Sequence, residues 1–161
     1  MEENEQKSVT WRSLVVLEAI TLGLGGVIAF VIRNDIPFYQ TIEKPSFAPP
    51  SWLFPIAWTI LYALMALSAW LCLRAQRPRQ GAFFTLYGGQ LAVNLVWPLL
   101  FFMLRALGLS FLWLVFLLVL IVLLTEGAFR RNTLAGWLLV PYVLWVAFAG
   151  ALNFSIAQMN P

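Results

Sequence analysis

The sequence predicts an all-α membrane protein, a five-transmembrane-helix bundle with a Pro-rich lid loop between the first and second helices. Hydrophobic residues make up 61% of the 161 residues and charged residues only 11%, against roughly 45–50% and 25% in an ordinary soluble domain. The apolar residues form five runs, each long enough to cross a bilayer, which takes about 20 residues. The charges gather in the segments between these runs.

A polar segment, residues 1–12, precedes a single membrane domain, residues 13–161. The first apolar run contains one charge, Glu18, and has no small-residue cleavage site, so we interpret it as a retained helix and not as a signal peptide. Most connections between runs are very short, which predicts that consecutive helices are antiparallel neighbours in one bundle. The helices are expected at about 13–32, 52–73, 81–104, 106–128 and 134–157.

The one long connection, residues 33–51, reads RNDIPFYQTIEKPSFAPPS. Its prolines remove backbone donors and disfavour helix at and just before their own positions. An ordinary linker would not need the aromatic side chains of Phe38, Tyr39 and Phe47. We therefore expect an ordered lid over one end of the bundle.

Basic residues predict the orientation in the membrane. The end that holds the N-terminus carries Lys7, Arg12, Arg74, Arg77, Arg79, Arg130 and Arg131. The opposite end carries Arg33, Lys44 and Arg105. This bias favours a cytoplasmic N-terminus in a bacterial cell membrane, with the lid and the C-terminus outside.

Composition also excludes several classes of function. The chain has no histidine and one cysteine, Cys72, which excludes zinc sites, Cys–His nucleophile pairs and a histidine-ligated haem. We expect no metal site and no required cofactor. There is no basic stripe of the kind that binds nucleic acid. The lack of a phosphate-binding Gly-Lys-Ser/Thr loop argues against transport driven by ATP.

Polar and aromatic residues share one face of the third helix, where Gln90, Asn94 and Trp97 are spaced i, i+4 and i+7. Polar side chains inside a membrane are costly and usually face the bundle interior. Pro98 follows directly and lacks the N–H that would bond the Asn94 carbonyl, so this stretch needs a partner or a cavity.

The fifth helix repeats this pattern, because Pro141 frees the carbonyl of Trp137. Its aromatic and polar face comprises Tyr142, Trp145, Ala149 and Asn153. The second helix adds Trp58 and Tyr62, again one turn apart. Three such faces predict a pocket for a planar, largely apolar ligand with polar edges.

Two other interpretations of these residues remain open. Tryptophan and tyrosine are enriched at membrane interfaces, which fits Trp11, Trp52 and Trp137 near helix ends but fits Trp145 and Asn94 less well. The interior residues are also compatible with simple helix–helix packing.

Gly88 and Ala92 form a small-xxx-small pair that permits close helix approach, and they suggest a homodimer through the third helix.

Three long strings resemble the TspO/translocator protein family, the tryptophan-rich sensory proteins also called peripheral-type benzodiazepine receptors. The strings are FYQTIEKPSFAPPSWLFPIAWTILY, LYGGQLAVNLVWPLLFF and PYVLWVAFAGALNF. The resemblance implies a five-helix bundle, often dimeric, whose cavity is closed by the loop after the first helix. It implies porphyrins such as protoporphyrin IX, other tetrapyrroles, sterols and isoquinoline or benzodiazepine drugs as ligands.

By matching strings, the resemblance implies ligand contacts at Tyr39, Pro49, Trp52, Trp58, Gln90, Asn94, Trp97, Tyr142, Trp145, Ala149 and Asn153. The spacing of the second helix adds Tyr62 to this set. The resemblance also implies light-dependent breakdown of protoporphyrin through Trp58 and Trp145 in some members. The chain departs from the sterol-recognition pattern of animal members, because Phe154 replaces its tyrosine and no basic residue follows. This departure argues against sterol binding there.

Three functions are therefore weighed. The first is a membrane receptor or carrier for tetrapyrroles, with a sensory or transport role. The second is an enzyme that degrades porphyrin under light, with Trp58 and Trp145 as the catalytic residues. The third is a small multi-substrate exporter, which would need a proton-coupled carboxylate in the membrane, and Glu18 is the only acid well inside a helix.

Overall fold

The computed structural model describes residues 10–161, and Lys7 and most of the predicted polar segment lie outside the described residues. The elements are α1 (Trp11–Ile32), α2 (Phe38–Thr41), α3 (Leu53–Arg74), α4 (Gln80–Pro98), the π-helix η1 (Leu99–Met103), α5 (Leu107–Phe129) and α6 (Thr133–Met159). Within this part of the chain five helices, with η1 counted as the end of α4, are long and apolar enough to cross a membrane. The predicted fold class is confirmed, and the boundaries agree within a few residues.

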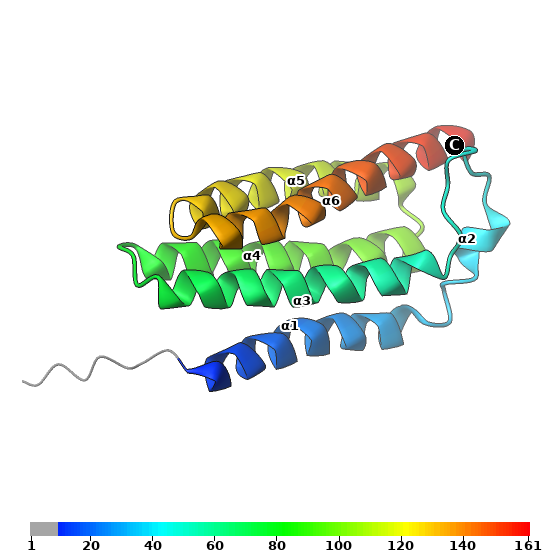
Figure 1. Ribbon diagram of the computed structural model, residues 1–161. Helices are drawn as coiled ribbons and strands as arrows, with labels where there is room; N and C mark the ends of the chain where they lie inside the picture. The colour runs from blue at the N-terminus through cyan, green and yellow to red at the C-terminus, as the bar shows by residue number, and fades with distance from the viewer. Residues whose placement is uncertain (1–9) are drawn as a thin grey trace, which may run out of the picture.

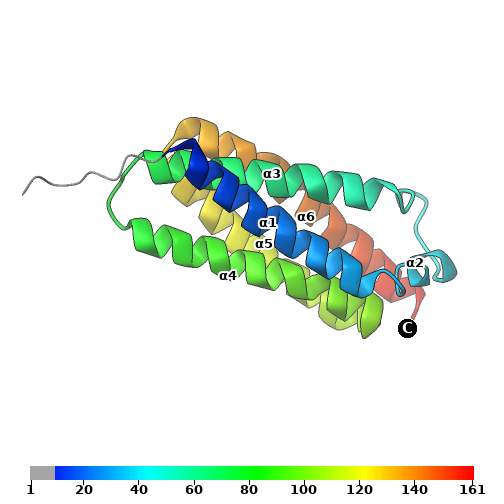
Figure 2. The same ribbon diagram turned by 90° about the horizontal axis from the view of Figure 1, so that it is seen from below.

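The helices form three layers (Figure 1). α5 and α6 pack along each other in one layer, α3 and α4 form the middle layer, and α1 lies alone in the third. The prediction that every consecutive pair packs as neighbours is wrong for α3 and α4, which meet at few positions. Figure 2 shows them apart, with α1 on one side of the space between them and α5 and α6 on the other.

Burial is concentrated in the two inner layers. Met65, Leu117, Ile121 and Leu124 are completely buried, whereas only Thr21 and Ile32 are buried in the whole of α1. The exposed apolar side chains of α1 therefore face the hydrocarbon of the bilayer, where they carry no penalty. α1 is the most weakly attached of the five spanning helices.

The end of α4 departs from the predicted single helix over residues 81–104. Pro98 ends the α-helix, and the next turn, η1, follows a π-helical path in which the Leu104 amide donates to the Leu99 carbonyl at 2.9 Å. Pro98 has no N–H to donate to Asn94, so the backbone ladder shifts here. The freed stretch lies beside the cavity described below.

The lid is ordered, as expected, and contains the short helix α2. Lys44 fixes it from within, because its Nζ atom donates to the carbonyls of Tyr39 and Ile42, both at 2.8 Å. The Phe38 ring packs edge-on against Phe101 of η1, with centroids 6.2 Å apart. The lid closes the end of the bundle at which α6 also ends (Figure 1).

Because the helices alternate in direction, one end of the bundle carries Arg12, Arg74, Arg77, Arg79, Arg130 and Arg131. The lid end carries Arg33, Lys44 and Arg105. The predicted separation of basic residues is thus present in the described part. That the arginine-rich end is cytoplasmic stays a prediction.

Candidate ligand-binding site

A cavity of about 360 Å³ lies between α1, the lid, α3 and the end of α4, at the lower end of the ~300–1,000 Å³ range of small-molecule sites. Four of its lining residues are exposed, namely Gly26 and Ala29 on α1 and Pro55 and Thr59 on α3. The cavity is therefore open along the seam between α1 and α3. Because both helices span the membrane, this opening faces the bilayer.

The α1 wall includes small residues, and one of them lets the backbone approach an aromatic ring. A Cβ atom added to Gly25 would lie 2.4 Å from Cε2 of Tyr62, a distance that real Cβ atoms do not reach. Only glycine therefore allows the Tyr62 ring to lie this close to α1. Close by, the Thr21 and Tyr87 hydroxyls share a buried 2.8 Å hydrogen bond that also joins α1 to α4.

Trp58 is the centre of the aromatic wall opposite α1. Its ring lies 5.7 Å from that of Tyr62, 6.3 Å from Trp97 and 6.2 Å from Tyr142, measured between centroids. Trp58, Tyr62 and Trp97 all line the cavity. The wall thus offers aromatic rings for stacking.

A buried hydrogen-bond chain behind this wall joins three helices. The Tyr62 hydroxyl donates to Oδ1 of Asn94 at 2.7 Å, and Nδ2 of Asn94 donates to the Tyr142 hydroxyl at 2.7 Å. That hydroxyl donates to Oε1 of Gln90 at 2.9 Å, while Nε2 of Gln90 has no partner in the described residues. The chain connects α3, α4 and α6. These polar groups hold helices together, and only Tyr62 also lines the cavity.

A second polar cluster lies nearer the lid. Asn153 accepts hydrogen bonds from Trp97 at 3.3 Å and from Ser110 at 2.9 Å, and it donates to the Leu107 carbonyl at 2.9 Å. Both its oxygen and its nitrogen are thereby engaged, and the side chain joins α4, α5 and α6. Asn153 is 1% exposed and does not reach the main cavity.

Trp145 and Ala149 of α6 also lie one layer away from the cavity. The Trp145 ring packs against Phe54, with centroids 6.1 Å apart, and its indole nitrogen is buried without a partner in the described part of the chain. Ala149 borders a separate void of about 20 Å³. Four aromatic residues line both this void and the main cavity and form a partition between the two spaces, namely Tyr39, Phe54, Trp97 and Phe102.

The predicted lid residues take different places. Tyr39 is 4% exposed and lines the cavity, and its hydroxyl donates to the Pro49 carbonyl at 3.2 Å. Desolvation raises the pKa of this phenol, so it stays protonated. Trp52, in contrast, is 64% exposed at the start of α3, as are Trp11 (68%) and Trp137 (61%) at other helix ends. These three match an interfacial belt.

The cavity wall is electrically neutral, since no charged residue lines it. Two cations near the lid stack on aromatic rings outside the cavity wall, Arg33 on Phe30 at 3.8 Å and Arg105 on Phe38 at 5.0 Å. Glu18 is half-buried on α1 outside the wall, and its Oε2 atom has no partner among residues 10–161. The described residues contain no cluster of acidic residues or cysteine that could hold a metal. The wall therefore offers surfaces for stacking and hydrogen bonding but no charge for an ion pair.

The α1 wall was not anticipated from the sequence. Gly25 and Gly26 are adjacent, and Ala29 follows one turn later. This spacing of small residues permits close approach and resembles ordinary helix-packing motifs. Gly88 and Ala92, the predicted dimer contacts, are exposed on α4, with open space where a Gly88 Cβ would lie. The homodimer stays a prediction.

Comparison with known proteins identifies one family model and several relatives of this chain. The model of the TspO/MBR family matches residues 14–159. The chain is 40% identical over 128 residues to Protein CrtK of Rhodobacter capsulatus, covering 77% of this chain and 79% of that protein. It is 38% identical over 151 residues to Tryptophan-rich protein TspO of Chlorobaculum tepidum, covering 89% and 95%. It is 31% identical over 138 residues to Translocator protein of Homo sapiens, covering 81% and 79%.

Proposed function

Because this chain belongs to the TspO/MBR family and is a multi-pass integral membrane protein, we propose that it is a receptor or carrier for a planar, largely apolar ligand. The proposed ligand class is the porphyrins and related tetrapyrroles, bound in the cavity between α1, α3 and the lid. The observation that carries the proposal is the neutral wall of aromatic rings centred on Trp58, which lines the cavity. A conjugated macrocycle offers ring faces for stacking and ring nitrogens that accept a hydrogen bond.

Two features of the site allow for a ligand larger than the cavity. The first is the partition that Tyr39 and Phe54 form together with Trp97 and Phe102, which separates the main cavity from the small void beside Ala149. Rotation of these rings would join the two spaces and bring the ligand edge toward Trp145. The open seam between α1 and α3 would admit a ligand that is dissolved in the membrane, and it would leave room for the part of a macrocycle that exceeds the cavity.

Titration of the purified protein in detergent with protoporphyrin IX tests this function. Tryptophan quenching and porphyrin absorbance are followed in darkness. Trp58→Phe is the test variant. Trp137→Phe is the control, because Trp137 is exposed near the start of α6, at the end of the bundle away from the lid. Saturable quenching is expected in the wild type and the control, and weaker binding in Trp58→Phe. Equal binding by all three proteins would show that protoporphyrin IX does not bind in this cavity.

The same samples under illumination separate binding from degradation. A receptor or carrier should shift the porphyrin bands without losing them faster than a protein-free sample. Loss of the bands under light only, and only with Trp58 and Trp145 both intact, would instead support the enzyme. If quenching is not saturable in either condition, the proposal of a tetrapyrrole ligand is rejected, while the fold assignment is unaffected.

A further inference from the structure

A second concave surface lies between α5 and α6, in the layer of the bundle farthest from α1 (Figure 1). It is an open groove of about 530 Å³. Its apolar part is formed by Val122, Val140, Val143 and Phe129. Because both helices span the membrane, the acyl chains of lipids contact the apolar part of the groove.

One end of the groove is charged. Glu126 and Arg130, one turn apart at the end of α5, form an ion pair at 2.5 Å, with side chains 55% and 75% exposed. A guanidinium carries five N–H donors, and only one of those of Arg130 is bonded to another described residue, Oε1 of Glu126. Arg130 therefore retains donors that point to solvent or to a ligand.

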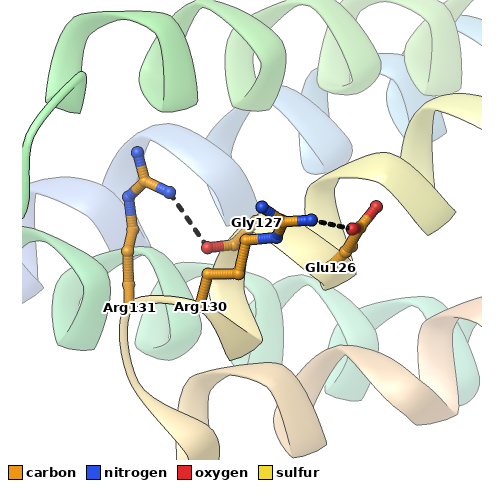
Figure 3. Close-up of polar contacts among 4 residues, drawn as sticks. All are labelled: Glu126, Gly127, Arg130 and Arg131. Atoms are coloured by element: carbon orange, nitrogen blue, oxygen red, sulfur yellow. Dashed lines mark hydrogen bonds and ion pairs between the residues drawn. The ribbon is translucent and has the colours of Figure 1, made fainter.

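The neighbouring Arg131 has a different role. It donates to the carbonyls of Gly127 at 3.0 Å, Pro78 at 3.4 Å and Arg79 at 3.1 Å. Figure 3 shows Arg131 directed toward the Gly127 carbonyl and Arg130 toward Glu126. Arg131 thus joins the α3–α4 turn to α5, while Arg130 remains at the rim of the groove.

The charge of this end of the bundle favours an anion. In the described part, the helix ends here carry six arginines (Arg12, Arg74, Arg77, Arg79, Arg130 and Arg131) and a single acid, Glu126. The preceding residues 1–9 contain three glutamates and one lysine, so basic residues still outnumber acidic ones. Basic residues near a membrane surface attract anionic headgroups by about 1 kcal/mol each. An arginine at the end of an apolar groove matches a phosphate joined to a hydrocarbon chain.

We propose that this groove binds one anionic phospholipid. An acyl chain lies along the valines between α5 and α6, and the headgroup phosphate accepts hydrogen bonds from Arg130. Glu126 competes with the phosphate for the same guanidinium and so weakens retention of the lipid. This site is independent of the cavity proposed for the planar ligand.

Two substitutions that both break the ion pair test the proposal, because they should act in opposite directions. Arg130→Gln removes the phosphate donor, and Glu126→Gln frees it. Delipidated protein in detergent is titrated with phosphatidylglycerol or phosphatidylcholine, and bound lipid is counted by native mass spectrometry. The wild type should retain phosphatidylglycerol better, Arg130→Gln should lose this preference by about fivefold, and Glu126→Gln should strengthen it.

Controls keep the test specific. Arg33→Gln removes an exposed arginine at the opposite end and should change nothing. Val143→Trp fills the groove, leaves the ion pair in place and should lower retention, which provides a second variant if Arg130→Gln does not fold.

Several outcomes would overturn the proposal. One is equal retention of the two lipids by the wild type, and another is the same direction of change in Arg130→Gln and Glu126→Gln, which would make the pair purely structural. Full competition by soluble glycerol phosphate would show an anion site without an acyl-chain groove. A dimer mass that Val143→Trp abolishes would show that a second copy covers the groove.

Discussion

Glu43 in the lid and Asn160 at the end of α6 exchange two hydrogen bonds although 117 residues separate them. The Glu43 amide donates to Oδ1 of Asn160 at 3.0 Å, and Nδ2 of Asn160 donates to the Glu43 carbonyl at 3.0 Å. The same Nδ2 atom also donates to the Ile156 carbonyl at 2.8 Å, which holds the side chain in place. One side-chain amide thus attaches the middle of the lid to the bundle.

Asn160→Ala should loosen the lid. Each exposed hydrogen bond contributes roughly 0.5–1.5 kcal/mol, so we expect hydrogen exchange of the lid amides, and dissociation of a bound porphyrin, to become several-fold faster. Hydrogen–deuterium exchange and stopped-flow fluorescence measure the two effects. Ser155→Ala removes an exposed hydroxyl of the same helix and serves as the control. Unchanged exchange near Glu43 would show that the lid is held by its other contacts.

Gly25→Ala should damage both stability and the cavity. The added methyl group would meet the Tyr62 ring at 2.4 Å, which forces either the ring or α1 to move, at a cost of about 1–3 kcal/mol. Thermal unfolding in detergent and porphyrin quenching report the two losses. Gly23→Ala is the matched control, because nothing lies within 4 Å of its new Cβ. Equal behaviour of the two variants would contradict the close approach of α1 to Tyr62.

The buried hydrogen-bond chain predicts an order of effects. Tyr142→Phe removes two bonds and Tyr62→Phe removes one, so Tyr142→Phe should be the more destabilising. Interhelical hydrogen bonds in membranes are worth about 0.6 kcal/mol on average. Because Asn94 connects the two hydroxyls, the double variant should be non-additive. Strict additivity in a double-mutant cycle of unfolding free energies would mean that Asn94 does not couple them.

Gly136 at the start of α6 should not tolerate alanine. Its added Cβ would lie 2.3 Å from the Phe129 ring, which packs edge-on against Trp137, so the turn between α5 and α6 would open. We expect a lower melting temperature without loss of porphyrin affinity in the remaining folded protein. Adding Phe129→Ala to the Gly136→Ala variant should restore part of the lost melting temperature. If the double variant is no more stable than Gly136→Ala, the steric explanation fails.

The spanning helices and the lid could be predicted from the sequence because hydropathy and proline content are local properties. The wall of the cavity could be predicted only in part, because Tyr39, Trp58, Tyr62 and Trp97 line it as expected but most of the other predicted residues do not. The stripe of Gln90 and Asn94 correctly indicated an interior face, but a stripe does not say whether its polar atoms meet a ligand or one another. Here Tyr62 and Tyr142 satisfy most of them.

The contribution of α1 was missed for a related reason. A glycine in a helix has no side chain to mark a contact, so the packing of Tyr62 on Gly25 is visible only in three dimensions. The effect of Pro98 could be predicted in part. Its missing donor was predicted from the residue type, but the π-helical turn that follows depends on the surrounding packing.

The opening between α1 and α3 changes the reference state for binding. A ligand that enters there leaves hydrocarbon, not water, so transfer of its apolar surface into the cavity contributes little free energy. A greasier compound partitions more strongly into the bilayer without preferring the cavity. Discrimination among membrane-soluble molecules would then rest on how well the shape of the ligand fits the aromatic wall, and its dissociation constants would be meaningful only as mole fractions of ligand in the lipid phase.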